Sequence, residues 1–258
     1  MEKLGLSAAS LPEVRSISES VKLFISCFER FGNLDEAGHK LRGHTWKTVD
    51  VNGNGHVSLA EVGQWIQTTL LHLTHNKKLY REFYPSYIRS FKDAADINGS
   101  KRIKGTALDE TDLLEIGEFR LFTVFLCLYA LMFDAFRFLD GSFEVDSHHQ
   151  SVFAFSGAAS TDTHHHGAPP HEITGVIDED RRITLVEFRM RHAGLAGSPF
   201  IALARAASVS GEEAIDGMFR LMDEDGKGAV LLSEFCAFIK KSEILAGTEI
   251  GRILSVGE

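Results

Sequence analysis

Cysteine, proline and tryptophan are scarce in this 258-residue chain, which also has no long apolar run and no excess of positive charge. Its cysteines, Cys27, Cys127 and Cys236, lie far apart, which excludes a disulfide framework and a CxxC metal pair. The longest apolar run, Leu121 to Phe133, is too short to span a bilayer, so we expect a buried helix and no transmembrane segment. The N-terminal residues lack an apolar signal region and have Glu2 where an acylated glycine would stand. We therefore expect no signal peptide and no N-myristoylation.

The net charge of -9 and the absence of catalytic motifs narrow the function classes further. An acidic surface argues against a nucleic-acid partner and suits a cytoplasmic protein that binds cations. The sequence contains no carboxylate dyad, nucleophile elbow or phosphate-cradling glycine loop. We therefore expect a protein that is not an enzyme.

One twelve-residue stretch, Asp50 to Glu61 (DVNGNGHVSLAE), has the spacing of a calcium-binding loop. Calcium takes about six to eight oxygen ligands, which such a loop supplies from positions 1, 3, 5, 7, 9 and 12. Those positions give the expected ligands Asp50, Asn52, Asn54, the carbonyl of His56, Ser58 and Glu61. Gly55 provides the positive φ needed at position 6, and Val57 is the apolar position 8 that pairs with a partner loop. Apolar residues at helical spacing flank the loop, which predicts an EF-hand with Ca²⁺ as its cofactor.

A second stretch, Asp223 to Glu234 (DEDGKGAVLLSE), repeats the pattern closely. Its candidate calcium ligands, at positions 1, 3 and 12, are Asp223, Asp225 and Glu234. Lys227 at position 5 has no lone pair to offer a metal, and Leu231 at position 9 cannot hold a water. The EF-hand fold is therefore expected here, while calcium binding stays open.

Two further stretches keep the pattern only in part. Val176 to Phe188 places Ile183 and Glu187 at positions 8 and 12, but has valine at position 1 and arginine at position 6. Asp96 to Ala107 places Ile103 at position 8, but has lysine for the glycine and alanine for the final acid. We expect neither contiguous loop to bind calcium. In the Asp96–Ala107 hand the final acid is a candidate for displacement. Glu118, eleven residues after Ala107, would be that acid and would begin the exit helix.

The four loops predict an all-α fold of four EF-hand units in two paired lobes. The expected position-8 pairs are Val57 with Ile103 and Ile183 with Val230. The lobes comprise residues 1–130 and 131–258, and a helix near Ser18 to Phe31 is expected to cover the first. Residues Leu113 to Leu139 are expected to run from the exit helix of hand two into the entry helix of hand three.

A long insertion, residues 141–175, interrupts the third hand and has the composition of a loop. The preceding helix is expected to end at Asp140, the original first position of this loop. If the insertion folds back, Asp140 could form a split metal site with Asp178, Asp180 and Glu187. The histidines of the insertion are His148, His149, His164, His165, His166 and His171. They could bind zinc, copper or nickel, or could simply belong to a flexible low-complexity loop.

The segment Glu115 to Asp140 (EIGEFRLFTVFLCLYALMFDAFRFLD) resembles the central segment of the flagellar calcium-binding proteins of trypanosomes, the calflagins. In that family a stretched second hand likewise ends in a Glu-Phe-Arg-Leu helix. The resemblance implies a calcium-responsive protein with a flagellar or axonemal location. This chain departs from the family in two ways: the acylated N-terminal glycine is missing, and hand one, not hands three and four, is the best preserved.

These features predict a calcium-binding regulatory or adaptor protein without catalytic activity. Its partner would be an amphipathic helix or a cytoskeletal or flagellar component, bound in an apolar groove that calcium changes. The alternative is a structural EF-hand module with little or no calcium response, because three of the four loops depart from the pattern.

Overall fold

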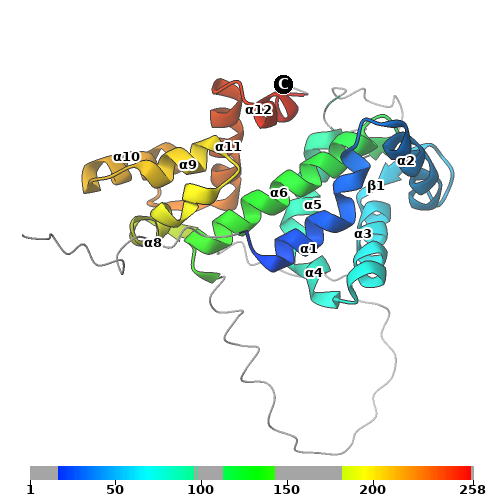
Figure 1. The fold of residues 1–258 in the computed structure, drawn as a ribbon, viewed down its shortest axis with the longest axis horizontal. Helices are drawn as coiled ribbons and strands as arrows, with labels where there is room; N and C mark the ends of the chain where they lie inside the picture. The colour runs from blue at the N-terminus through cyan, green and yellow to red at the C-terminus, as the bar shows by residue number, and fades with distance from the viewer. Residues whose placement is uncertain (1–16, 96, 98–112, 143–181, 257–258) are drawn as a thin grey trace, which may run out of the picture.

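The computed structural model describes residues 17–95, 97, 113–142 and 182–256, and these are mostly helical (Figure 1). The elements that precede the longest helix are α1 (Glu19–Phe28), the 3₁₀ helix η2 (Glu29–Gly32), α2 (Glu36–Val49), β1 (His56–Ser58), α3 (Leu59–Thr74), α4 (Lys77–Glu82), α5 (Tyr84–Ala95) and β2 (Leu113–Glu115). The longest helix and the elements after it are α6 (Phe119–Leu139), β3 (Arg182–Thr184), α8 (Leu185–Arg191), the 3₁₀ helix η4 (His192–Gly197), α9 (Ile201–Ser208), α10 (Glu212–Met222), β4 (Ala229–Leu231), α11 (Leu232–Leu245) and α12 (Glu249–Leu254).

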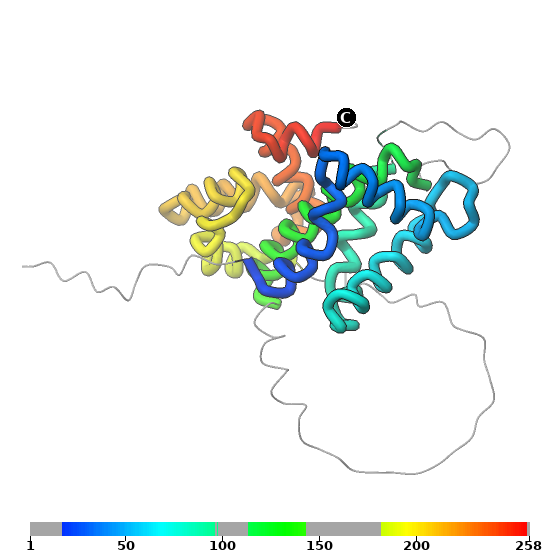
Figure 2. The backbone as a smooth tube through the Cα atoms, turned by 45° about the vertical axis from the view of Figure 1, so that its right-hand side comes forward, coloured from blue at the N-terminus to red at the C-terminus, as the bar shows by residue number. Residues whose placement is uncertain are grey.

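The helix α6 connects two groups of helices (Figures 1 and 2). Along its length it packs against α1, η2 and α5, and also against α8 and α11. We call α1 to α5 with the N-terminal part of α6 the first lobe, and α8 to α12 with the C-terminal part of α6 the second lobe. The expected boundary between residues 130 and 131 falls inside this helix, so the two lobes share one continuous element in place of a linker.

Each lobe contains one short antiparallel pair of strands. Val57 of β1 lies opposite Leu114 of β2, and Ile183 of β3 lies opposite Val230 of β4. The second register is the predicted one. The first is not, because the sequence pattern had assigned Ile103 as the partner of Val57. The partner strand β2 lies further along the chain than predicted, because it stands just before α6.

Polar side chains at the helix starts explain where several helices begin. Ser18 caps α1, and Ser58 with Glu61 forms a reciprocal capping box at the start of α3. Glu118 is the N-cap residue of α6 and Asp140 its C-cap residue, which confirms both predicted ends of this helix. The predicted N-terminal helix is also confirmed, as α1 followed by η2.

The core is rich in phenylalanine, and α6 contributes much of it. The helix has the length and composition to cross a membrane, but 72% of its most apolar window is buried inside the protein. Phe119, Phe122 and Phe136 on this helix are fully buried. At its two ends Phe119 packs against Trp46 of the first lobe, with ring centroids 5.6 Å apart, and Phe136 against Phe235 of the second, also at 5.6 Å. One helix therefore carries core residues of both lobes.

Candidate metal centres

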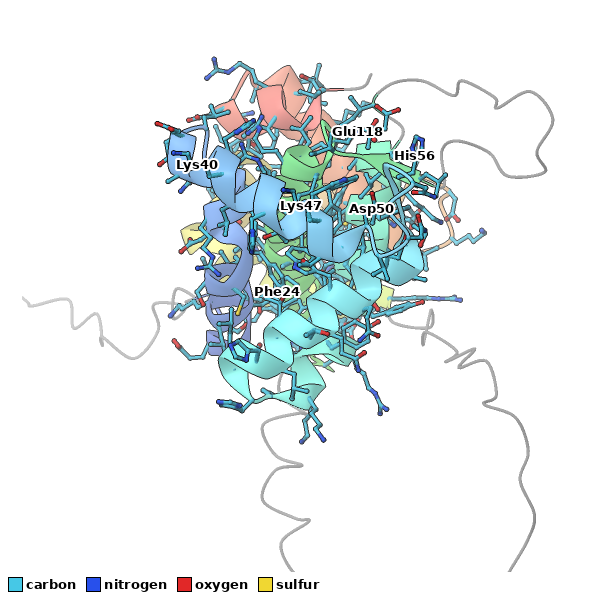
Figure 3. All side chains as sticks on the ribbon, turned by 90° about the vertical axis from the view of Figure 1, so that its right-hand side faces the viewer. Phe24, Lys40, Lys47, Asp50, His56 and Glu118 are labelled. Carbon is cyan, nitrogen blue, oxygen red and sulfur yellow. The ribbon has the colours of Figure 1, made fainter. Side chains whose placement is uncertain are left out.

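The first candidate centre, loop 1 (Asp50–Glu61), connects α2 to α3 at one end of the first lobe (Figure 3). Asp50 follows the last residue of α2, and its carboxylate accepts two backbone hydrogen bonds. Asn54 N–H donates to Oδ1 at 3.1 Å and Gly55 N–H to Oδ2 at 2.9 Å. Gly55 has a φ of 83°, which favours glycine and lets the chain turn back toward Asp50.

The asparagines at positions 3 and 5 continue this arrangement. The Oδ1 atom of Asn52 accepts from Asn54 N–H at 2.9 Å, and the Oδ1 atom of Asn54 accepts from His56 N–H at 2.9 Å. The side-chain oxygens of Asp50, Asn52 and Asn54 therefore all accept hydrogen bonds from backbone N–H groups of the same loop.

Glu61 closes the loop from the first turn of α3. Its Oε2 atom accepts from Ser58 N–H at 2.9 Å and from the Ser58 hydroxyl at 2.8 Å. Its Oε1 atom accepts from the side-chain amide of Asn52 at 3.2 Å. The final acid is thus already placed against position 3 of the same loop.

The donor set of loop 1 fits a calcium ion chemically. The two carboxylates, two amide oxygens, one hydroxyl and the His56 carbonyl are hard oxygen donors of the kind calcium prefers. Asp50, Ser58 and Glu61 are half-buried, while Asn52 and Asn54 are exposed, so the loop is open to solvent.

The second candidate centre, loop 4 (Asp223–Glu234), repeats the hydrogen bonds of loop 1. Lys227 N–H donates to Oδ1 of Asp223 at 3.1 Å and to Oδ1 of Asp225 at 3.0 Å. Gly228 N–H donates to Oδ2 of Asp223 at 2.9 Å, and the φ of this glycine is 81°. The two loops therefore share these three hydrogen bonds and the positive φ at position 6.

The acidic cluster of loop 4 contains its own cation. Asp223, Asp225 and Glu234 can each place one carboxylate oxygen within 4.8 Å of the others. The ammonium of Lys227 lies 2.6 Å from Oδ2 of Asp225. This hydrogen bond lowers the pKa of Asp225 and raises the pKa of Lys227. The sequence identified Lys227 as a poor ligand, and the structure adds that it is bonded to one of the candidate ligands.

The acids at position 12 also have a structural role. In all four units a carboxylate oxygen accepts a hydrogen bond from the backbone N–H three residues earlier. The bonds are Ser58 to Glu61 at 2.9 Å, Glu115 to Glu118 at 2.8 Å, Thr184 to Glu187 at 2.8 Å and Leu231 to Glu234 at 2.8 Å. Three of these acids thereby cap the starts of α3, α8 and α11, whereas Glu118 bonds back to Glu115 of β2 and makes no side-chain cap bond to α6.

Several predicted positions lie outside the described residues. They are Ile103, Asp178, Asp180 and the histidines of the insertion. Of the proposed split site, Asp140 and Glu187 are described. Asp140 Oδ1 accepts from Ser142 N–H at 2.8 Å, and Glu187 caps α8.

Sequence reasoning missed Leu114 as the position-8 residue of the second unit, although the signal was present. In the other three loops position 8 stands four residues before the acid at position 12, as Val57 does before Glu61. Applied to the displaced Glu118, the same spacing gives Leu114. An insertion that displaces the acid displaces the strand with it.

Comparisons of the chain with models of protein families, with curated proteins and with solved structures found no significant match. What these loops can bind must therefore be judged from their own geometry.

Proposed function

We propose that this chain is a calcium-binding regulatory or adaptor protein without catalytic activity, built from four EF-hand units in two pairs. Loop 1 is its main calcium site, with Asp50, Asn52, Asn54, His56, Ser58 and Glu61 as ligands. Loop 4 is a weaker site formed by Asp223, Asp225 and Glu234. The proposed location is cytoplasmic, with flagellar or cytoskeletal association as the expectation drawn from the calflagin resemblance.

The observation that carries this proposal is the agreement between loops 1 and 4. Two loops far apart in the sequence make the same hydrogen bonds through positions 1, 3, 5 and 6. Each also pairs with a partner strand through its position-8 residue. A chance turn can account for a single loop of this kind, whereas two matching loops indicate a repeated unit.

The position of the ligands supports a regulatory role. Asp50 ends α2 and Glu61 lies in the first turn of α3, so a shared ligand fixes the angle between these helices. Bound calcium supplies a divalent charge that offsets the repulsion between the two carboxylates. The exit helix α3 also carries Trp65, four residues beyond Glu61, whose ring packs against Phe28 and Phe31. A change of helix angle at loop 1 therefore acts directly on the aromatic packing of the first lobe.

Isothermal titration calorimetry of the wild type and of Glu61→Gln tests the calcium site. Glutamine also serves at this position of a capping box, so the helix start is kept while a ligand charge is lost. We expect a calcium-binding heat in the wild type that weakens strongly in Glu61→Gln. The matched control is Glu187→Gln, the same change at the same position of the third unit, which should leave the heat unchanged. A wild type without any heat up to millimolar calcium refutes the proposal.

A structural module with little calcium response is the second candidate. The hydrogen bonds of the four position-12 acids favour it, because each acid is bonded to the backbone of its own loop and this bond requires no ion. Fluorescence of a hydrophobic dye, measured with calcium and with a chelator, separates the two functions. A calcium-dependent increase supports the regulatory protein, whereas equal dye binding in both conditions supports the structural module.

A further inference from the structure

The N-terminal segment formed by α1 and η2 lies across the first lobe, beside α6 (Figures 1 and 2). Phe24, Phe28 and Phe31 of this segment are each no more than 3% exposed. Phe24 and Phe28, four residues apart, lie on one face of α1, and Phe31 is the buried residue of η2 that follows. Figure 3 shows Phe24 among the helices of this lobe, at a distance from the calcium loop marked by Asp50.

Three rings of other elements receive these side chains. The ring centroid of Phe24 lies 4.4 Å from that of Phe83, and Phe28 and Phe31 each lie 5.3 Å from Trp65. Phe31 also meets Phe119 of α6, edge to face, at 6.4 Å. We call Phe83, Trp65 and Phe119 the aromatic platform. Two of these residues lie close in sequence to candidate loop acids. Trp65 is four residues after Glu61, and Phe119 directly follows Glu118.

The opposite face of α1 is solvated. Glu19 and Lys22 form an exposed ion pair at 2.7 Å, and the side chain of Leu23 is 40% exposed. The segment thus has the shape of an amphipathic helical ligand, with aromatic anchors at positions i, i+4 and i+7.

Polar contacts hold the segment at its two ends. At the N-terminal end the Ser18 hydroxyl donates to Asp134 at 2.5 Å, and the Ser20 hydroxyl donates to Glu82 at 3.0 Å. At the C-terminal end the guanidinium of Arg42 donates to the carbonyl of Phe31 at 2.8 Å and to that of Asn33 at 2.6 Å. Between these ends the described contacts across the interface are largely aromatic and aliphatic packing.

We propose that the aromatic platform is a helix-docking surface whose resident occupant is the chain's own segment, residues 18–32. An external partner helix must present large apolar or aromatic side chains at i, i+4 and i+7 and must displace this segment. Competition of this kind reduces the apparent affinity of a partner to its intrinsic affinity multiplied by the fraction of molecules in which the platform is free. Docking of residues 18–32 on the aromatic platform is independent of the proposed calcium function. Only the control of this docking through loop 1 rests on that function.

The test uses the full-length chain and a fluorescein-labelled synthetic peptide of residues 17–34, with serine in place of Cys27. In the variant Phe24→Asp a carboxylate enters the apolar interface, which favours release of the segment. The matched control is Leu23→Asp, the same charge placed on the solvated face of the same helix. In fluorescence anisotropy we expect Phe24→Asp to bind the peptide at least tenfold more tightly than the wild type and Leu23→Asp do. The anisotropy measurement is repeated with a chelator and with calcium, so that a failure of peptide binding can be told apart from a failure of calcium binding at loop 1.

Two outcomes overturn the proposal. Either Phe24→Asp keeps its helical circular dichroism but captures no peptide, or it loses the cooperative unfolding transition of the first lobe, which makes α1 a permanent part of the core. Hydrogen exchange of the wild type provides a readout without a variant. We expect the amides of α1 to exchange through a local opening, faster than those of α6. Equal protection of both helices contradicts a displaceable segment.

Discussion

Replacing Lys227 by asparagine should turn loop 4 into the stronger of the two proposed calcium sites. The backbone N–H of Lys227 already donates to Asp223 and Asp225, as Asn54 N–H does to its two matching partners in loop 1. The substitution therefore needs no change of backbone conformation. It removes the ammonium that lies 2.6 Å from Oδ2 of Asp225 and supplies a side-chain oxygen at position 5.

The expected gain follows from the charges. At the ligand positions of loop 4, three carboxylates and one ammonium sum to a formal charge of −2, which becomes −3 in the variant, compared with −2 from the two carboxylates of loop 1. An ammonium about 4 Å from a divalent ion, in water, weakens binding on the order of thirtyfold. The new oxygen adds to this gain, while Leu231 at position 9 still supplies no side-chain ligand.

Calorimetry in a Glu61→Gln background isolates loop 4, and native mass spectrometry counts the bound ions. We expect Lys227→Asn to add one calcium ion per chain at concentrations where the parent binds none in loop 4. Lys241→Asn, which removes a charge from the exposed side of α11, controls for net charge. If the double variant shows no calcium heat up to millimolar, the assignment of Lys227 as the competing cation is wrong.

Three further predictions concern the second lobe. The hydrogen bond with Arg189 lowers the pKa of Asp216. The stabilisation that this pair gives the folded protein is therefore present above about pH 4 and is lost as the pH falls below it. The melting-temperature difference between wild type and Asp216→Asn should therefore be largest at neutral pH and shrink in acid. Burial raises the pKa of Cys236 to about 12, so its thiol should react with an alkylating reagent at pH 8 only after unfolding in urea. Glu243, 1% exposed, accepts from a backbone N–H of α9 and from Thr248, and Glu243→Ala should lower the free energy of unfolding by about 2–4 kcal/mol in urea titrations.

The sequence predicted those features that depend on local helix chemistry or on a spacing that two loops share. The ends of α6, at Glu118 and Asp140, follow from chemistry that acts within a few residues. The long-range pairing of β3 with β4 was predicted because both loops place an apolar residue at position 8. The partner of Val57 was wrong because a long-range pairing depends on where an insertion ends, and Leu114 becomes evident only when position 8 is counted back from Glu118. The docking of α1 on Trp65 depends on tertiary packing, which periodicity does not encode. The ion pair of Lys227 with Asp225 is local, but the spacing of the loop does not give the side-chain conformation that forms it.

The acids at position 12 explain how damaged loops can persist in this fold. Calcium needs oxygens from several positions, so the loss of position 1 or of the glycine removes a site outright. The bond from the N–H three residues earlier needs only the acid that accepts it, and Glu118 and Glu187 still make this bond in the two damaged loops. Strand pairing needs only an apolar residue at position 8. A chain that needs only the fold can therefore keep positions 8 and 12 and lose the other ligand positions, which is the pattern of the loops that end at Glu118 and at Glu187. Loop 1 alone keeps an oxygen-bearing side chain at positions 1, 3, 5, 9 and 12, and neither capping nor strand pairing requires Asn52 or Asn54 to be there.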